Sequence, residues 1–306
     1  MLGDLNEAVK DGFMDLDTES TYRFVHDKVR EAAYGMIPSE EKDRFHFCLG
    51  MALLSTHKSQ KEGKGDNLFA TIDQVNHGVP ALLQSKEQRI SIATLNLEAA
   101  AKGMQSYNYT SAYRHAMAAI SMLLDDSWTT HHDLSLNLHF QLAKSAYACS
   151  KIDDARDALE QVLEHADSLQ TILDAYDLLR SIIFGACVPE DYGRFSAMIA
   201  DLLRSLGEDL PADDDAIRND LPNQVKAAKE SLEGRTDASL LDMSVSGSES
   251  AVAIARAYDL LVGLTYAVKP KLCPYYTARA VQYILNSKVA CKYNPGKLMC
   301  ASSCPA

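Results

Sequence analysis

The feature that most constrains the fold of this 306-residue chain is an internal repeat of apolar and small residues. Three segments share one helical spacing, with offsets of 43 and then 40 residues between them: Tyr109-Ala112-Ala116-Ala119-Ile120, Ile152-Ala155-Leu159-Val162-Leu163 and Tyr192-Phe195-Ile199-Leu202-Leu203. The residues upstream repeat at the same offsets: Ala99-Ala100-Gly103, Leu142-Ala143-Ala146 and Ile182-Ile183-Ala186. Apolar residues at this period indicate a buried helix face, and small residues let helices approach closely. The pattern predicts successive helical hairpins, each packed on the next.

Helical periodicity recurs along most of the chain, whereas strand-like alternation is scarce. We therefore predict an all-α fold, built as a solenoid of tetratricopeptide-like hairpins. The repeat is longer than the usual tetratricopeptide unit of about 34 residues, so a HEAT-like arrangement is the alternative.

The segments on either side of the repeat are also predicted to be mainly helical. Near the N-terminus, one helix ends before Pro38 and carries an apolar face of five residues: Val25, Val29, Ala32, Ala33 and Met36. A second helix is expected from about Glu40 to Leu54, followed by a flexible surface loop over 55–67. The GKGDN of that loop lacks the spacing of a phosphate-binding P-loop. After the repeat, EDLPADDDAIRNDLP interrupts the array, NQVKAAKESLEG is helical, and helices return over 250–268 and 274–288.

The composition excludes several classes of partner. The formal net charge is −12, whereas nucleic acids and anionic membrane surfaces attract clustered Lys and Arg. The apolar run YDLLVGLTYAV at 258–268 is shorter than the roughly 20 residues of a membrane-spanning helix, so a buried core helix is expected. No cationic and then apolar N-terminal segment indicates export, and seven scattered cysteines suit reduced thiols. We expect a cytoplasmic protein that binds neither nucleic acid nor membrane.

Several stretches resemble a known family. YRFVHDKVREAAYGMIPSEEKDRFHFCLGMALL is similar to the end of the ATPase module in large STAND-type signalling proteins, especially multidomain sensor and hybrid histidine kinases. IDQVNHG, LNLEAAAKGMQSYNYTSAYRHAMAAISMLLDDSW, LGEDLP, SLEGRTDASLLDM and YAVKPKL then follow in the order of that family's helical segment. The resemblance covers about residues 10–290. In such proteins an AAA-like ATPase core precedes this segment, and GAF and histidine-kinase domains follow it.

The resemblance and the patterns together divide the chain into five parts. Residues 1–57 are expected to form the end of a winged-helix-like part of an ATPase module, and 58–84 a loop and connecting helix. Tetratricopeptide-like hairpins are expected over 85–208, an acidic and polar interruption over 209–249, and a further, truncated hairpin over 250–306. The chain has no Walker A or kinase motif, so we expect it not to be an enzyme by itself.

The resemblance also implies a role for a pair of polar residues. By position, His26 and Asp27 match a motif of STAND ATPases whose histidine approaches the nucleotide phosphates, although Phe24-Val25 replaces the motif's methionine context. With Arg30 one turn further on, they would sense nucleotide state in the larger protein, which would bind ATP or ADP with Mg; no cofactor is expected in this chain. The alternative, preferred for the isolated chain, is that the pair ends a helix, where an acid is favourable. A phospho-accepting histidine would be followed by Leu-Arg-Thr-Pro, not by Lys-Val-Arg.

Two groups of residues look metal-like at first. Adjacent side chains on a helix point about 100° apart, so for His131-His132-Asp133 we prefer a role in helix entry. Four cysteines match no zinc-ribbon or finger spacing: Cys273, Cys291, Cys300 and Cys304. We therefore predict no metal site.

Two other features are interpreted as structural. Trp128 is expected to anchor neighbouring hairpins, with its indole N–H donating to a carbonyl. Gly185-Ala186-Cys187 follows no strand, and the chain holds no G-x-S-x-G elbow, so no catalytic residue is predicted.

Three functions remain open from the sequence. The first is a regulatory helical arm that couples a nucleotide-controlled switch to an output domain through protein contacts. The second is a peptide-binding scaffold unrelated to any kinase, and the third is a metal-dependent hydrolase. The acidic charge favours a basic protein or peptide surface as the partner.

Overall fold

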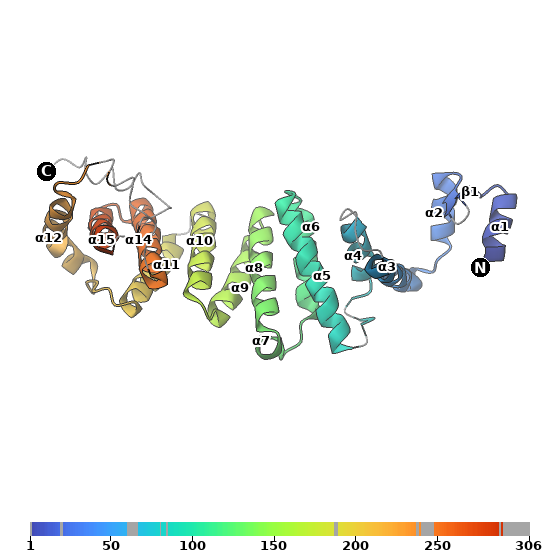
Figure 1. Cartoon of the computed structure of the whole chain (residues 1–306), viewed down its shortest axis with the longest axis horizontal. Coiled ribbons are helices and arrows are strands. Elements are labelled where there is room, and N and C mark those ends of the chain that lie inside the picture. The colour runs from blue at the N-terminus through green and yellow to red at the C-terminus, as the bar shows by residue number, and fades with distance from the viewer. Residues whose placement is uncertain are drawn as a thin grey trace. The chain divides into compact units, whose positions relative to one another are not determined.

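The computed structural model describes residues 2–18, 21–59, 67–79, 81–83, 85–186, 189–236, 239, 248–287 and 289. This part of the chain is mostly helical, in agreement with the predicted fold class (Figure 1). The chain divides into two compact units: the first holds Met1–Lys102 with Met117–Leu124, and the second holds Gly103–Ala116 with Asp125–Ala306. Residues of the first predicted hairpin belong to both units, and the predicted division into five parts stays a prediction.

After its first helix, the first unit contains a small hairpin of strands that the all-α prediction omitted. The elements before the repeat are α1 (Leu2–Lys10), β1 (Met14–Thr18), β2 (Thr21–Phe24), α2 (Asp27–Gly35), the 3-10 turn η1 (Ser39–Glu41), α3 (Lys42–Ser59) and α4 (Asn67–Asn76). The strands pair antiparallel, so that Met14 lies opposite Phe24 and Leu16 opposite Tyr22. These pairs place the apolar residues on one face of the ribbon, which is what alternation in MDLDT indicates.

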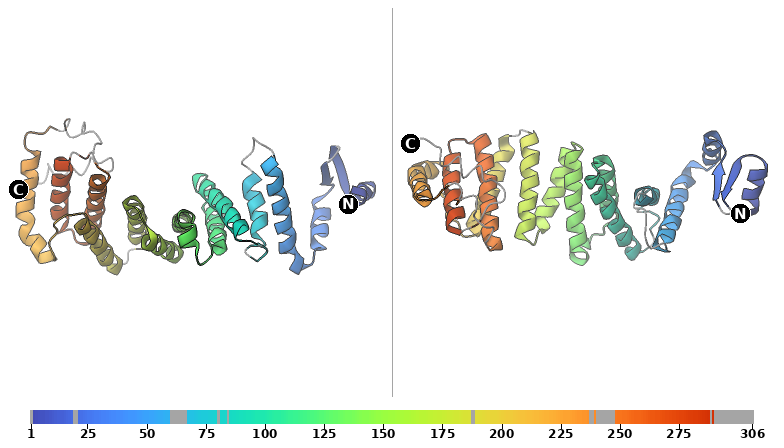
Figure 2. Two further views of the ribbon diagram at one scale, coloured as in Figure 1. Left: turned by 60° about the horizontal axis from the view of Figure 1, so that its bottom comes forward. Right: turned by 45° about the horizontal axis from the view of Figure 1, so that its top comes forward.

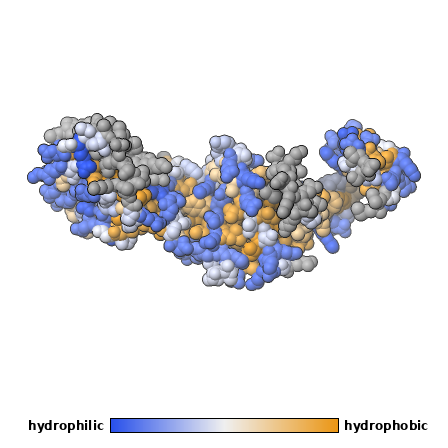
Figure 3. Space-filling model, viewed as in Figure 1, coloured by the Kyte–Doolittle hydropathy of each residue, from blue (hydrophilic) through white to orange (hydrophobic). Residues whose placement is uncertain are grey.

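The apolar face predicted for the first helix is not buried in the first unit. In α2 no described residue is buried, and Val25 and Met36 on either side of it are 50% and 83% exposed. Figure 3 shows apolar residues in orange among hydrophilic ones at this end of the chain. A polar contact joins this helix to α3, since the Tyr34 hydroxyl lies 2.8 Å from Nε2 of His46. The periodicity therefore predicted a helix correctly and its burial wrongly.

Close packing of α3 on α4 depends on Gly50. A Cβ at this position would lie 2.6 Å from the backbone nitrogen of Val75 and 3.0 Å from the carbonyl oxygen of Thr71. The predicted second helix ends at Leu54, but α3 continues to Ser59. Residues 60–66 of the predicted loop, including its GKGD, lie outside the described part of the chain.

The repeat corresponds to alternating first and second helices of hairpins. They are α5 (Lys86–Gln105) and α6 (Tyr109–Met122), α8 (His132–Ala148) and α9 (Ile152–His165), and α10 (Leu169–Ala186) and α11 (Pro189–Ser205), with the short α7 (Ser127–Thr130) before α8. Most of the predicted face is buried, including Ala99, Ala100, Ala112, Ala116, Ala119, Leu142, Ala143, Ala146, Ala155, Leu159, Val162, Ile182, Ile183, Phe195, Ile199 and Leu203. The small residues work as predicted, since a Cβ on Gly103 would lie 3.0 Å from the Cβ of Ala112.

Equivalent turns join the two helices within each of the first two hairpins. Tyr107 and Ser150 occupy corresponding positions of the repeat, and both have a positive φ, of 60° and 59°. A left-handed residue is a common way to end a helix and reverse the chain. The repeat therefore extends to backbone conformation as well as to side-chain burial.

The segment LGEDLP is held by a turn and a polar contact. Gly207 has a φ of 95°, which ends α11 in a conformation that favours glycine. The carboxylate of Glu208 then accepts hydrogen bonds from the Tyr258 hydroxyl and, at 3.0 Å, from the Arg279 guanidinium. Burial and the contact with Glu208 raise the pKa of Tyr258. These contacts attach the end of α11 to the last two helices of the second unit.

The acidic interruption is itself helical. Helix α12 (Asp214–Leu232) begins nine residues before the predicted NQVKAAKESLEG and passes through Pro222. It begins there because the Asp213 side chain accepts hydrogen bonds from the backbone N–H groups of Asp215 and Ala216. In Figure 2, α12 lies beside α15 (Cys273–Ser287), and α15 lies beside α14 (Glu249–Val268). Gln282 of α15 donates a hydrogen bond to the carbonyl oxygen of Gln224 on α12.

Helix α14 is a core helix of the second unit. Among the described residues, it alone is long and apolar enough to cross a membrane by length and composition, and 61% of its apolar window is buried. It begins nine residues before the apolar run identified in the sequence. The side chain of Arg256 in this helix is only 7% exposed and pairs with Asp174 at 2.9 Å and Asp177 at 2.5 Å. The predicted burial of the 258–268 run is confirmed for its larger part.

Candidate functional site

The proposed nucleotide-sensing residues lie together in the first turn of α2. His26 is the residue before the helix, and its Nδ1 accepts a hydrogen bond of 3.0 Å from the backbone N–H of Lys28. Asp27 lies in the first turn, and its carboxylate is 3.3 Å from the Arg30 guanidinium. These are the contacts of a helix N-terminus, as the alternative interpretation expects.

These three side chains do not fit a nucleotide by themselves. The side chains of Arg30 and Asp27 are 62% and 77% exposed, and their charges already offset one another. A triphosphate needs several converging donors, and an exposed ion pair contributes little. The sensing role of His26, Asp27 and Arg30 in a larger protein stays a prediction.

A more developed concave surface lies in the second unit, between the second helices of two successive hairpins. Residues of α9, α10 and α11 line a cavity of about 400 Å³, which is within the usual range of binding pockets. The apolar lining consists of Leu159, Leu163, Leu179, Ile183, Phe195 and Met198. We call this surface the α9–α11 groove.

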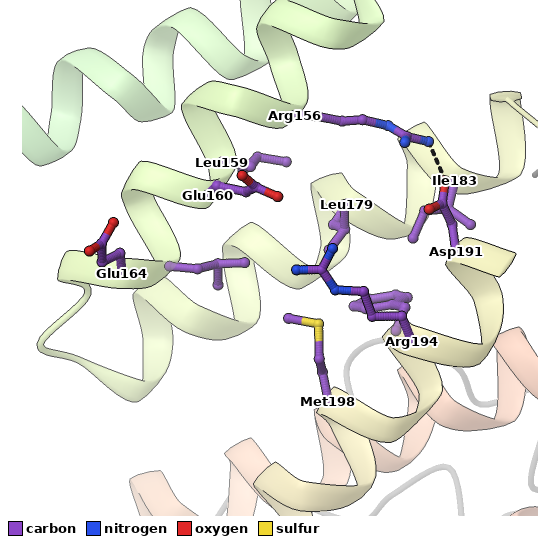
Figure 4. Close-up of a pocket in the computed structure, with 11 residues that line it drawn as sticks. Arg156, Leu159, Glu160, Glu164, Leu179, Ile183, Asp191, Arg194 and Met198 are labelled. Atoms are coloured by element: carbon purple, nitrogen blue, oxygen red, sulfur yellow. Dashed lines mark hydrogen bonds and ion pairs between the residues drawn. The ribbon is translucent and has the colours of Figure 1, made fainter.

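Charged side chains border the α9–α11 groove. Figure 4 shows Arg156 of α9 paired with Asp191 of α11 at one end. Arg194 extends from α11 toward the α9 side, whereas Glu160 and Glu164 belong to α9. Arg194, Glu160 and Glu164 are exposed. The groove thus combines an apolar interior with an acidic edge on α9 and a basic group on α11.

The helical periodicity of the sequence brings the acidic residues of α9 to one side of that helix. Four acids of α9 recur at one-turn spacing on its exposed side: Asp153, Asp157, Glu160 and Glu164. The buried side of the same helix carries Ala155, Ala158, Leu159 and Val162. Helix α9 is therefore strongly amphipathic, with acids opposite its packed face.

A second cluster surrounds the single tryptophan. Trp128 of α7 stacks on His165 at a ring distance of 3.9 Å and on His139 at 4.9 Å, and it meets His132 edge-on at 6.1 Å. Trp128 thus packs between the two helices of one hairpin, whereas the sequence predicted an anchor between neighbouring hairpins. The predicted role of His131-His132-Asp133 in helix entry agrees with the structure, because α8 begins at His132.

Two of these histidines, His132 and His139, have pKa values shifted in opposite directions. The pKa of His132 is raised, first by its hydrogen bond of 2.9 Å to the carbonyl of His165 and then by the acids Asp167 and Asp133. The pKa of His139 is lowered by burial, and the nearby His165 acts in the same direction. As the pH falls, His132 is therefore protonated before His139, and the Trp128 ring contacts both side chains.

The predicted absence of catalytic and metal residues can be compared only with the described part of the chain. There, no three His, Cys, Asp or Glu side chains form a group that could hold a metal ion. Cys187, Cys291, Cys300 and Cys304 lie outside the described residues. The hydrolase alternative thus gains no support from the described side chains.

Sequence reasoning missed both the groove and the tryptophan cluster. The amphipathic pattern of IDDARDALEQVLEH was visible, but which side chains of α10 and α11 would face it was not. His139 and His165 carry no motif, and only the folded hairpin brings them to Trp128.

Comparisons with known proteins show similarity over only part of the chain. No protein-family model matches the chain, and no solved structure matches it significantly. The chain is similar to the hybrid signal transduction histidine kinase G of Dictyostelium discoideum, with 22% identity over 167 residues, or 47% of this chain. It spans about 5% of the length of that curated relative. The similarity suggests a role related to signalling, while the STAND-type and tetratricopeptide-like assignments stay predictions.

Proposed function

We propose that this chain is a non-catalytic interaction arm of a signalling system of the hybrid histidine-kinase kind. The α9–α11 groove binds a segment of a signalling domain, and the nucleotide state of an associated ATPase changes how the arm and that domain are arranged. Such coupling requires only that the two states differ in their contacts with the arm. The system works in the cytoplasm, and its ATP or ADP with Mg is bound outside this chain.

The observation that carries the proposal is the α9–α11 groove. Its interior is apolar, its edges are charged, and it lies between helices that pack stably on their neighbours. A surface of this composition suits a protein segment, because apolar side chains supply affinity and edge charges supply specificity. The similarity to a histidine kinase supplies the signalling context.

The groove also supports a second candidate, a stand-alone peptide-binding scaffold. Both functions use the same surface, but only the signalling arm changes the activity of a histidine kinase.

The test measures ATP-dependent histidine phosphorylation by the signalling protein that carries this helical segment. The groove variant combines Leu163→Ala with Arg194→Glu, and the control combines Leu232→Ala with Lys229→Glu on α12. Circular dichroism should show that both variants stay helical. We expect the groove variant to change phosphorylation at least about threefold, as a coupling of around 1 kcal/mol would. Equal phosphorylation by the parent and both variants would contradict the signalling arm.

A further inference from the structure

The α9–α11 groove offers one half-buried apolar residue from each of its three helices: Leu163, Leu179 and Met198. These residues lie beside a buried floor formed by Leu159, Ile183 and Phe195. An amphipathic helix carries apolar side chains at i and i+3 or i+4 on one face, about 5–6 Å apart. Such a helix laid along the groove would place its apolar face against these three residues.

The polar groups of the groove are at its edges. Phe195 and Ile183 in its interior are 1% and 3% exposed. Arg156 is engaged with Asp191, and the other charged residues of the lining are exposed. A small polar ligand would need several converging polar groups in the interior, whereas apolar side chains need none. The groove is thus suited to a segment with an apolar stripe.

The acidic edge formed by α9 determines which charge a ligand of the groove should carry. Asp153, Asp157, Glu160 and Glu164 form one exposed acidic stripe, and Glu160 and Glu164 line the groove. The only basic residue of α9 before its last turn is Arg156, which is engaged with Asp191. The whole chain adds a net charge of −12. Complementary charge steers and orients a partner, so this edge favours Lys and Arg.

We infer that the occupant of the α9–α11 groove is a basic amphipathic helix, which specifies the partner class of the proposed function and rests on it. Its apolar residues at i and i+3 or i+4 insert between α9 and α11, and its Lys or Arg residues face Glu160 and Glu164. The opposite charge arrangement would bring like charges together along α9 and is disfavoured.

The test uses three labelled peptides of about 18 residues, or five helical turns, and fluorescence anisotropy with the whole chain. The first peptide carries Leu at i, i+3, i+4 and i+7 with Lys on its flanks. The second replaces Lys with Glu, and the third keeps the composition of the first but shuffles Leu so that no apolar face forms. We expect the first to bind at least about tenfold more tightly than the others, since both contact types are needed. Equal binding of the first and second, or of the first and third, would overturn the inference.

Reversing the charges of Glu160 and Glu164 tests whether the peptide binds at the α9–α11 groove. Glu160→Lys with Glu164→Lys should weaken binding of the basic peptide about tenfold and strengthen binding of the acidic one. The control, Glu7→Lys with Asp11→Lys, changes an exposed acidic pair of the same spacing by the same charge, and binding should change by less than about twofold. Equal weakening by both variants would show attraction by net charge alone and overturn the inference.

The phosphorylation experiment tests the proposed function, and the peptide-binding experiment tests the inference, so either one can fail without the other. If the groove variant changes histidine phosphorylation but the basic peptide does not prefer the groove, the inference is wrong and the proposed function stands. If the peptide binds as expected but phosphorylation is unchanged, the groove binds a partner outside kinase signalling, and the proposed function is wrong.

Discussion

Replacing Gly50 with alanine should destabilise the first unit, although alanine is the better helix former. Gly50 lies within α3 and faces α4, and an added Cβ would be 2.6 Å from both the backbone nitrogen and the Cγ2 of Val75. The carbonyl oxygen of Thr71 would be 3.0 Å away. Two of these three atoms belong to the backbone, so no rotamer change can relieve the overlap.

The expected change in the free energy of unfolding is the difference between two opposing contributions. The new methyl group must push α4 away to reach ordinary contact, and overpacking of this kind costs about 1–3 kcal/mol. The gain in helix propensity from glycine to alanine is about 1 kcal/mol. Because rigid backbone meets the methyl group, we expect the cost to exceed the gain and the free energy of unfolding to fall by up to about 2 kcal/mol.

Urea unfolding followed by circular dichroism measures this change, and hydrogen exchange of the α3 and α4 amides assigns it to the first unit. Gly193→Ala is the matched control, because Gly193 lies in α11 with no atom within 4 Å of an added Cβ. Helix propensity alone then acts, and the variant should be stabilised by about 0.5–1 kcal/mol. An increase in stability for Gly50→Ala would refute the packing of α3 against α4.

Three further predictions concern the hairpins, the tryptophan cluster and nucleotides. Ala116→Leu and Ala146→Leu place a larger side chain at positions that are 0% exposed, and each should cost about 1–3 kcal/mol; unchanged melting in scanning calorimetry would mean that the hairpin register is wrong. Burial lowers the pKa of His139, so its contribution to stability is present above its unfolded pKa of about 6.5 and lost as the pH falls. His139→Gln should therefore reduce the loss of stability below about pH 6.5, as followed by Trp128 fluorescence in urea, and an unchanged pH profile would exclude this role. Titration calorimetry of the isolated chain with ADP and Mg should show no binding, whereas micromolar binding would reveal a nucleotide site.

The sequence predicted the hairpins well because their contacts are periodic. Ala112, Ala116 and Ala119 recur on one face, and close packing requires their small size, so the pattern and the structure share one cause. Where a buried face depends on a neighbour along the chain, the spacing of apolar residues is sufficient to predict it.

The N-terminal part was harder to predict for a physical reason. Val25 and Met36 satisfy the helical pattern but are exposed, since periodicity indicates which face could be buried and not whether a surface covers it. The strand ribbon was missed because each strand offers only two or three alternating residues, such as Met14 and Leu16.

The candidate site could be predicted only in part. Glu160 and Glu164 belong to a visible acidic stripe, but the groove beside them arises from the placement of α10 and α11. Trp128 was expected to anchor neighbouring hairpins, but its ring packs within one hairpin, where its histidine partners depend on how α8 and α9 pack.

The most direct test of the proposed arm is site-specific photo-crosslinking from the α9–α11 groove inside cells that make the signalling protein. A photoreactive phenylalanine analogue replaces Arg194 at the groove edge, and a control replaces Lys229, an exposed residue of α12. The account predicts that the Arg194 position yields crosslinked peptides from a histidine-kinase or ATPase domain, identified by mass spectrometry, and that the Lys229 position does not. Equal crosslinking from the two positions, or no signalling-domain peptide from Arg194, would contradict it.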